Sequence, residues 1–471
     1  MNTVRQNILA LIVFVAVTAC NPFGTRSTVG GGDGTLLPGA LQPTLVSPSA
    51  ANTNPIPVIL SWPETVIGFS IADLSVTNGS PNTFGGSGSD YTFNIVPTAP
   101  GTVTITIADG ACENASGEPS VATVLTISYD LTAPSVAISL TSGQNPTTGT
   151  LPVSFDVVFS EAIATASFTT SDITQQGSAT GITWALTNSG DNTNFTLTAT
   201  AVSGDMGMLR PYIAASAYTD IAGNSGSAST GSNRSVVYLT NYSSVKLWLR
   251  ADTLALANGA NVTSWDDDSS SGNDVSEATN PPTCLTPAQN SLPAVRFAGG
   301  STLLRSTSNS GITGNPDMTI FVVAKVNGAV SSYPTFLQIG ETSSDGASAW
   351  FGLDGATSNI FSGFYNGGTK STATASASFA LYTWVRDSAS GTANSQTGNT
   401  QYWNGASATT ATSLATNAVS LTDGKFRIGR STLNVTANAD IAEIMVFHNT
   451  ALGAATRSQI ESYLNGKWNL Y

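Results

Sequence analysis

Short runs in which apolar and polar residues alternate recur along most of this chain, with clusters of Gly, Asn, Asp and Pro between them. Residues 102–107 read Thr-Val-Thr-Ile-Thr-Ile, and residues 194–198 read Asn-Phe-Thr-Leu-Thr. Successive side chains of a β-strand point to opposite faces, so this period of two predicts strands with one apolar face. Many such runs at close spacing predict an all-β chain built from sandwich domains.

One segment near the C-terminus has a different period. Apolar or long side chains recur there every three or four positions, which places them on one face of a helix. The spacing predicts a short helix over residues 454–468 that docks on a sandwich. Its stripe consists of Ile460, Tyr463, Leu464, Lys467 and Trp468.

The first twenty residues have the layout of a secretory signal peptide. A single charge, Arg5, precedes an apolar run over residues 8–17, which is shorter than the roughly 20 residues of a membrane-spanning helix. The run leads into Val-Thr-Ala-Cys at residues 17–20, which resembles the lipobox of bacterial lipoproteins. The resemblance implies cleavage before Cys20 and attachment of lipid to its thiol. An ordinary signal peptide over residues 1–20 is the alternative.

Residues 21–42 contain Gly-Gly-Gly, Asp-Gly and Pro-Gly and have no apolar period, so they predict a flexible tether. In the lipoproteins that the chain resembles, an Asp directly after the lipidated Cys retains the protein at the inner membrane. The corresponding residue here is Asn21. The resemblance therefore implies lipid anchoring in the bacterial outer membrane and display at the cell surface.

Residues 43–130 and 131–240 share one layout, which predicts two tandem β-sandwiches. The second has Phe-Ser-Glu at residues 159–161, Phe-x3-Asp-Ile at 168–173 and Asp-Ile-Ala-Gly-Asn at 220–224. The pair resembles the bacterial Ig-like repeats of surface adhesins. The first unit departs from the pattern in its last turn and has a Pro before its Glu.

Residues 241–471 carry another series of motifs in order. They include Leu-Trp-Leu-Arg-Ala-Asp at 247–252, Leu-Pro-Ala-Val-Arg-Phe at 292–297 and Ala-Glu-Ile-Met-Val-Phe at 442–447. Asn-Gly at 404–405 predicts a tight hairpin turn. The series resembles the concanavalin A-like, laminin-G-like jelly roll that ends many bacterial secreted proteins. The resemblance implies two curved antiparallel sheets whose concave face often binds glycans or proteins.

The charged and reactive residues limit the kinds of ligand, metal site and disulfide that the chain can have. There are 16 basic and 29 acidic residues and a net charge of −13, which argues against nucleic acid because phosphate binding relies on Lys and Arg. One His and three Cys allow no His-based metal site and no disulfide framework. Cys112 and Cys284 are expected as free buried thiols in different domains, and His448 as a surface turn residue.

Several acidic residues are candidate Ca²⁺ ligands, because Ca²⁺ takes several converging oxygens. Asp130, Glu161 and Asp220 form one candidate set, although turn capping is the interpretation that we favour for them. Asp266 and Asp268 form the other, in an acidic run that also fits a polar turn. The sequence predicts no cofactor, and bound Ca²⁺ is the alternative.

Trp350, Asp354 and Tyr365 are the candidate glycan-binding residues, because aromatic faces stack on sugar rings while carboxylates bond hydroxyl groups. The alternative is that these side chains belong to the core.

A retaining glycoside hydrolase needs two carboxyl groups about 5 Å apart. The Glu-x-Asp-x-x-Glu string of the hydrolases in this fold class does not occur. Asp440 and Glu443 are three apart and are expected on opposite faces of their strand, with Glu443 bonded to a buried Arg or a backbone group.

The sequence thus predicts a non-catalytic, adhesin-like surface lipoprotein whose head binds polysaccharide or extracellular protein. A structural envelope protein and a divergent glycan-cleaving enzyme are the alternatives.

Overall fold

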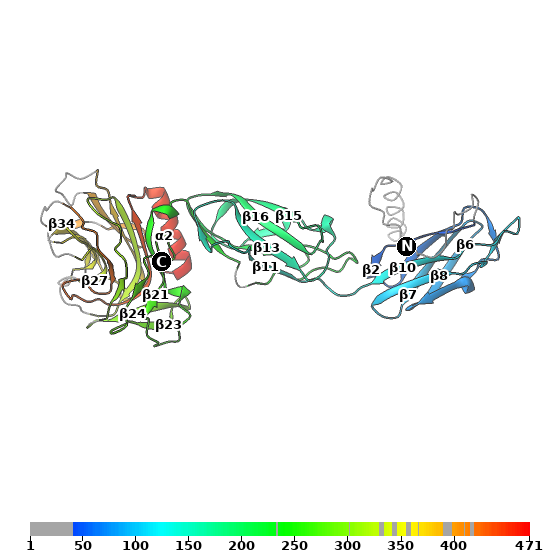
Figure 1. The fold of residues 1–471 in the computed structure, drawn as a ribbon, viewed down its shortest axis with the longest axis horizontal. Coiled ribbons are helices and arrows are strands. Elements are labelled where there is room, and N and C mark those ends of the chain that lie inside the picture. The colour runs from blue at the N-terminus through cyan, green and yellow to red at the C-terminus, as the bar shows by residue number, and fades with distance from the viewer. Residues whose placement is uncertain are drawn as a thin grey trace. The chain divides into compact units, whose positions relative to one another are not determined.

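The computed structural model describes residues 41–471 except 232–233, 301, 329–333, 342–345, 355–358, 366, 390–397, 409 and 415–418. The predicted signal peptide, Cys20 and nearly all of the predicted tether lie outside the described residues. The described chain is all-β and carries one short α-helix close to its C-terminus (Figure 1). It divides into two compact units, the first ending at Tyr129 and the second beginning at Asp130. Within the described residues, no helix is both long and apolar enough to cross a membrane.

The first unit is a sandwich of two four-stranded sheets. One sheet has the order β1 (Thr44–Val46), β3 (Ile56–Ser61), β7 (Asp90–Pro97) and β6 (Gly79–Ser87). The other has the order β2 (Ala50–Ala51), β10 (Thr123–Tyr129), β8 (Gly101–Ile107) and β5 (Leu74–Thr77), and β4 (Val66–Ile67) pairs with β9 (Glu113–Asn114). On β8 the side chains of Val103, Ile105 and Ile107 are fully buried and those between them are not, which confirms the period of two.

The second unit begins with another sandwich. Its larger sheet has the order β11 (Val136–Leu140), β13 (Val153–Phe159), β16 (Asn194–Ser203) and β15 (Thr180–Asn188). The opposing strands are β12 (Thr147–Thr148), β19 (Val236–Leu239) and β17 (Met206–Leu209), with β14 (Ile173–Gln175) paired to β18 (Pro211–Ile213). Edge-to-face rings of Phe159, Phe168 and Phe195 form part of the core between them.

The head, from β20 (Val245–Arg250) onward, is a larger sandwich. One sheet has the order β23 (Thr283–Gln289), β24 (Leu292–Ala298), β36 (Asn438–His448), β26 (Met318–Val326), β31 (Ala380–Arg386), β32 (Asn399–Trp403) and β33 (Ala406–Ala408), with β20 also on β36. The other has the order β21 (Ser264–Trp265), β22 (Val275–Ser276), β25 (Leu304–Ser306), β35 (Phe426–Ile428), β27 (Thr335–Ile339), β28 (Ala349–Leu353), β29 (Asn359–Phe364), β30 (Gly367–Thr374) and β34 (Thr410–Leu414).

Helix α2 (Ala454–Trp468) has the bounds that the sequence predicts, and Ile460, Tyr463, Leu464 and Trp468 are buried as expected. The Asn-Gly turn is also confirmed: Asn404 and Gly405 both have positive φ between β32 and β33, as a two-residue hairpin turn requires.

Head strands depart from simple alternation. The side chains of β36 are buried at nine consecutive positions, and β26 has seven buried in a row. The helix explains part of this pattern, because Glu443 on β36 and Thr383 on β31 bond to residues of α2. Strands covered on both faces read as continuous apolar runs.

Three side chains of the second sandwich belong to the hydrophobic core of the head. Met206 on β17 and Val237 and Leu239 on β19 are buried in the same cluster as the head's Trp248 and Leu247. Strands β17 and β19 therefore contribute side chains to the core of the head as well as to the core of their own sandwich.

Candidate functional site

The three candidate glycan-binding residues lie close together on the nine-stranded sheet of the head. Ala349, Phe351 and Leu353 of β28 point into the core, so Trp350 and Asp354, which alternate with them, belong to the outer face. Tyr365 follows β29, and its ring centroid lies 5.9 Å from that of Trp350 in an edge-to-face arrangement.

Local packing holds the Trp350 indole in place. Its Nε1 donates to Ser348 Oγ at 2.9 Å. The residue opposite it on β29 is Gly363, where a Cβ would lie 2.3 Å from the Gly368 backbone. Trp350 is only 7% exposed, whereas Tyr365 is partly exposed. A ligand arriving at this face would therefore meet the phenol ring of Tyr365 before the indole.

An ion pair borders the two rings. Lys370 on β30 donates from Nζ to Asp354 Oδ2 at 2.8 Å; the Asp354 side chain is 4% exposed and that of Lys370 is 20% exposed. The Lys370 ammonium group thus neutralises the Asp354 carboxylate and is the more accessible of the two. Lys370 was not among the predicted site residues, because its place in a strand beside β29 follows only from the sheet order.

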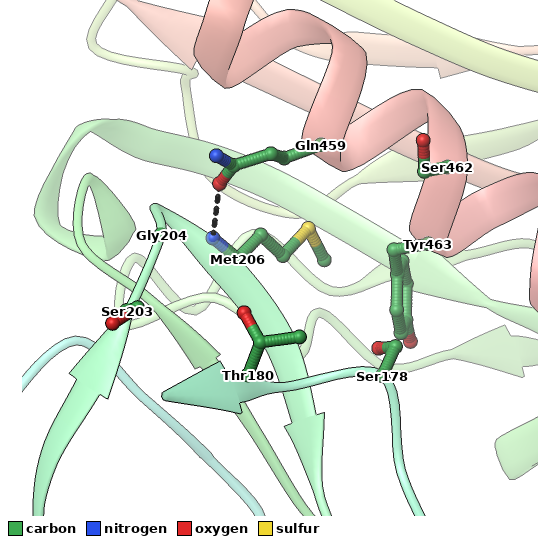
Figure 2. A pocket seen from close by; sticks show the side chains of 8 residues that line it. All are labelled: Ser178, Thr180, Ser203, Gly204, Met206, Gln459, Ser462 and Tyr463. Atoms are coloured by element: carbon green, nitrogen blue, oxygen red, sulfur yellow. Dashed lines mark hydrogen bonds between the residues drawn. The ribbon is translucent and has the colours of Figure 1, made fainter. Parts of the chain in front are cut away.

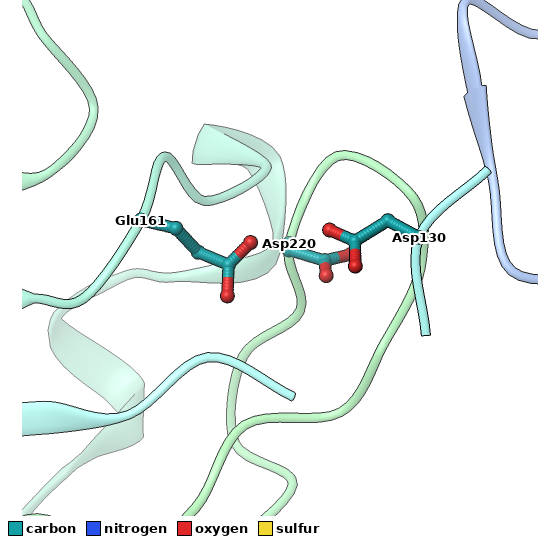
Figure 3. Close-up of side chains that lie close together, drawn as sticks. All are labelled: Asp130, Glu161 and Asp220. Carbon is teal, nitrogen blue, oxygen red and sulfur yellow. The ribbon is translucent and has the colours of Figure 1, made fainter. Parts of the chain in front are cut away.

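Asp130, Glu161 and Asp220, the first candidate Ca²⁺ set, converge (Figure 3). One carboxylate oxygen from each lies within 4.8 Å of the others. Asp220 also caps its turn: its Oδ1 accepts from Gly223 N at 2.7 Å and from Asn224 N at 2.8 Å. The turn-capping interpretation of Asp220 is therefore confirmed.

The electrostatics of this carboxylate cluster are unfavourable to full ionisation. Burial, then the charges of Asp130 and Asp220, raise the pKa of Glu161 above its usual 4.5. Three like charges at this spacing either retain a proton or attract a cation. The oxygen donors fit part of the shell that Ca²⁺ requires, with water or backbone oxygens needed for the remainder. Ca²⁺ binding here stays a prediction.

The second Ca²⁺ candidate set is arranged differently. Asp268 Oδ2 accepts from Arg250 Nε at 2.7 Å, and Asp266 Oδ1 accepts from Ser264 Oγ at 3.2 Å. Asp267 accepts hydrogen bonds within the same turn, from Ser269 N among others. These hydrogen bonds are those of a polar turn. Within the described residues, the acidic ligands that converge are the three of the first set.

Asp440 and Glu443 are each held by different partners. Arg296 binds Asp440 in a bidentate pair of 2.7 and 2.9 Å. Glu443 accepts from the indole nitrogens of Trp248 and Trp468, both at 2.7 Å. Lys467 Nζ completes the set at 2.8 Å. The expectation that Glu443 bonds to a buried Arg or a backbone group is therefore wrong, because the docked helix supplies a Lys and an indole.

The two described cysteines and the single histidine are partly or fully buried in the fold. Cys112 and Cys284 are free and buried, as predicted, and burial raises the pKa of both thiols. His448 was expected in a surface turn, but it is the last residue of β36 and is partly buried. Burial and then Lys246 lower the pKa of its imidazole.

A pocket of about 220 Å³ lies where α2 meets the second sandwich (Figure 2). Ser178, Thr180, Ser203, Gly204 and Met206 line it from the sandwich side. Gln459, Ser462 and Tyr463 line it from the helix. The alternating patterns of the sequence could not predict this pocket, because it forms between segments that are far apart in the chain.

No known protein family matches the sequence, and no curated protein matches it. Solved structures give weak likenesses. Domain 4 of the extracellular arabinanase AbnA from Geobacillus stearothermophilus, in complex with arabinotriose, is 13% identical with a TM-score of 0.29 over 46% of this chain and 97% of that one. An arabinofuranosidase complexed with arabinofuranosyl-xylobiose is 14% identical with a TM-score of 0.34, over 44% and 51%.

Two further likenesses are of the same order. The botulinum neurotoxin serotype D binding domain is 13% identical with a TM-score of 0.29, over 48% of this chain and 52% of that one. Trypanosoma rangeli sialidase is 10% identical with a TM-score of 0.31, over 88% and 67%. TM-scores this low identify neither a shared fold nor a shared function.

Proposed function

We propose that this chain is a non-catalytic surface protein whose head binds polysaccharide on the outer face of the nine-stranded sheet. The observation that carries the proposal is the grouping of Trp350 and Tyr365 beside the ion pair of Asp354 and Lys370. An aromatic ring offers a face for the apolar side of a sugar ring, and a neighbouring charged pair offers donors and acceptors to its hydroxyl groups.

The N-terminal sequence supplies the rest of the proposal. Lipid on Cys20 anchors the chain in the bacterial outer membrane, the tether and two sandwiches project the head from the cell surface, and many copies per cell add avidity to weak sites. An extracellular protein is the other class of ligand.

The test uses the full chain in mild detergent, because the head alone would lose the packing of Met206, Val237 and Leu239. The protein is applied to glycan and matrix-protein arrays with and without Ca²⁺. Tyr365→Ala and Lys370→Met are expected to weaken binding to the selected glycan by about tenfold or more, which corresponds to about 1.4 kcal/mol. Tyr471→Ala is the matched control, because Tyr471 is an exposed tyrosine of the same domain.

Each of the other results favours a different function. Failure to bind any array in either buffer would favour a structural envelope protein. Shortened oligosaccharides after incubation with the bound glycan would favour a glycan-cleaving enzyme. Equal loss in Tyr471→Ala would show that the outer face of the nine-stranded sheet is not the binding surface.

A further inference from the structure

The second sandwich has two positive charges, and they lie close to each other. Arg210 and Arg234 are the only basic residues between positions 41 and 240, a stretch that contains 13 acidic residues. Arg210 lies between β17 and β18, and Arg234 lies just before β19. Neither forms an ion pair with any residue that the structure describes. The two cations are thus placed beside each other in an acidic stretch, and not beside its carboxylates.

Contacts with neutral groups hold Arg234 against β18. Its guanidinium carbon lies 5.6 Å from the centroid of the Tyr212 ring. Nη1 donates to Ser229 O at 3.3 Å and to Ser229 Oγ at 3.1 Å, and Nη2 donates to Gln176 Oε1 at 3.4 Å. The backbone nitrogen of Gln176 donates to Arg210 O at 2.9 Å. Gln176 therefore contacts both arginines.

The charge of Arg234 is buried without an anionic partner. The residue is 8% exposed, and its Nε has no hydrogen-bond partner within the described part of the chain. Burial, and then the charge of Arg210, lower the pKa of the Arg234 guanidinium. Buried charges are normally paired, because taking a charge out of water is costly. A negative group bound here would offset both the burial of Arg234 and its repulsion by Arg210.

Arg210 gives this pair of charges an accessible face. Arg210 is exposed, in contrast to Arg234, and the neighbouring Gln176 is exposed as well. A guanidinium group offers several N–H donors in one plane, which suits the oxygens of an anion. The amide nitrogen of Gln176 adds a neutral donor, since only its Oε1 is used in the bond from Arg234. An anion on this surface contacts Arg210 directly, while the covered Arg234 acts through its charge.

We propose that Arg210 and Arg234 bind a phosphate group. Their two positive charges match a phosphate monoester, which carries a charge of about −1.5 to −2 at pH 7. Residues 130–240 also contain seven acidic residues, which would repel the further charges of a long polyanion, so a single group is favoured. Free phosphate and phosphate carried on a larger molecule both present this group. Neither arginine belongs to the nine-stranded sheet, so the proposal does not rest on the function proposed above.

The experiment measures ligand binding to the full chain in mild detergent by isothermal titration calorimetry at constant ionic strength. The ligands are inorganic phosphate and glycerol 3-phosphate, with acetate as a singly charged comparison. Both phosphates are expected to bind and to raise the unfolding temperature, since a ligand of the native state stabilises it. Acetate is expected to bind at least about tenfold more weakly. Tighter binding of glycerol 3-phosphate would identify a carried phosphate as the ligand, and equal affinities would identify free phosphate.

Arg210→Gln removes the exposed charge and is expected to weaken phosphate binding about tenfold. Without phosphate this variant is expected to be at least as stable as the unaltered chain, because the repulsion between the two arginines is gone. An arginine with a purely structural role would give the opposite change in stability.

Two substitutions test the covered charge. Arg234→Gln is expected to weaken phosphate binding about fivefold, and Arg234→Lys, which keeps the charge, is expected to restore most of it. Circular dichroism checks that each variant is folded before its affinity is measured. Equal affinities in Arg234→Gln and Arg234→Lys would show that the charge of Arg234 has no part in binding.

Arg305→Gln is the matched control, because Arg305 is an exposed arginine of the head that already has Glu341 at 3.8 Å. It is expected to bind phosphate as the unaltered chain does. The proposal is overturned if neither phosphate binds, if Arg305→Gln weakens binding as much as Arg210→Gln does, or if acetate binds as tightly as phosphate. Tyr365→Ala and Lys370→Met on the glycan arrays report on the nine-stranded sheet alone, so failure of one proposal is distinguishable from failure of the other.

Discussion

Two carboxylate sites of the second compact unit, one at Glu443 and one at Glu161, have surroundings with opposite electrostatics. Glu443 is 1% exposed and is met by one ammonium and two indole donors. Glu161 is met by two further carboxylates, those of Asp130 and Asp220. The first arrangement compensates a buried charge and the second concentrates like charges. We infer that the first contributes to architecture and that the second makes stability depend on pH and cations.

The pKa directions follow the same division. Burial alone would lower the pKa of Lys467, yet Glu443, followed by Tyr463 and Asp252, raises it above the usual lysine value. Lys467 therefore stays charged against Glu443 at any physiological pH. The pKa of Glu161 is raised by burial and its acidic neighbours, so the fold favours its protonated form. Removing a charge is therefore expected to have opposite effects on stability in the two places.

Glu443→Leu is expected to give the largest effect. The variant leaves Lys467 buried beside Asp252 alone and deprives Trp248 and Trp468 of their acceptor, so we expect the free energy of unfolding to fall by about 3–5 kcal/mol. Urea unfolding followed by tryptophan fluorescence measures the change. Glu341→Gln is the control, because Glu341 is 35% exposed in a surface pair worth at most about 1 kcal/mol. Equal shifts in the two variants would contradict the architectural role of Glu443.

Local features of the second unit were predictable from the sequence, whereas contacts between distant segments were not. The helix over residues 454–468 was predictable because its stripe is local, and the Asn404–Gly405 turn because its backbone geometry selects those residue types. The partners of Glu443 were not predictable: Trp248 lies 195 residues away, and only the docking of α2 brings Lys467 above β36. Burial of β36 on both faces has the same origin.

The site residues divide in the same way. Asp130, Glu161 and Asp220 were grouped as candidate Ca²⁺ ligands, and the structure brings them together. Asp266 and Asp268 looked like a similar group in sequence, but the turn directs Asp268 to Arg250. Adjacent acidic residues do not imply convergence, because the local hydrogen bonds of a turn decide where each carboxylate points.

Asp220→Ala is expected to have an intermediate effect. Asp220 is 2% exposed and accepts from the backbone nitrogens of Gly223 and Asn224 and from Asn224 Nδ2, so its removal takes away the acceptor of three hydrogen bonds. We expect a loss of about 1–3 kcal/mol in the free energy of unfolding, measured in EDTA. Asp220→Asn keeps an acceptor and is expected to recover part of it. An unchanged or increased stability in Asp220→Ala would mean that like-charge repulsion outweighs the capping bonds.

Glu161→Gln is expected to have the smallest effect, and in the opposite direction. Because the folded pKa of Glu161 is raised, the native state binds more protons than the unfolded state between pH 4.5 and the raised folded pKa. Stability from this group is therefore present at low pH and is lost as the pH rises through the raised folded pKa. At pH 7 in EDTA, Glu161→Gln is expected to gain less than about 1 kcal/mol because the group is only partly buried, and this part of the pH dependence should disappear.

Adding Ca²⁺ to the Glu161→Gln measurement tests whether the three carboxylates bind the ion. If the three carboxylates hold the ion, a Ca²⁺ concentration tenfold above its dissociation constant stabilises the unaltered chain by about 1.4 kcal/mol at pH 7. The same addition is then expected to stabilise Glu161→Gln less, because one charged ligand is lost. Thermal unfolding between pH 4 and 7, with EDTA or Ca²⁺, gives both quantities in one series. The prediction is wrong if stability in EDTA rises with pH and is unchanged by Glu161→Gln. The charges of the three carboxylates would then already be compensated, as the charge of Glu443 is.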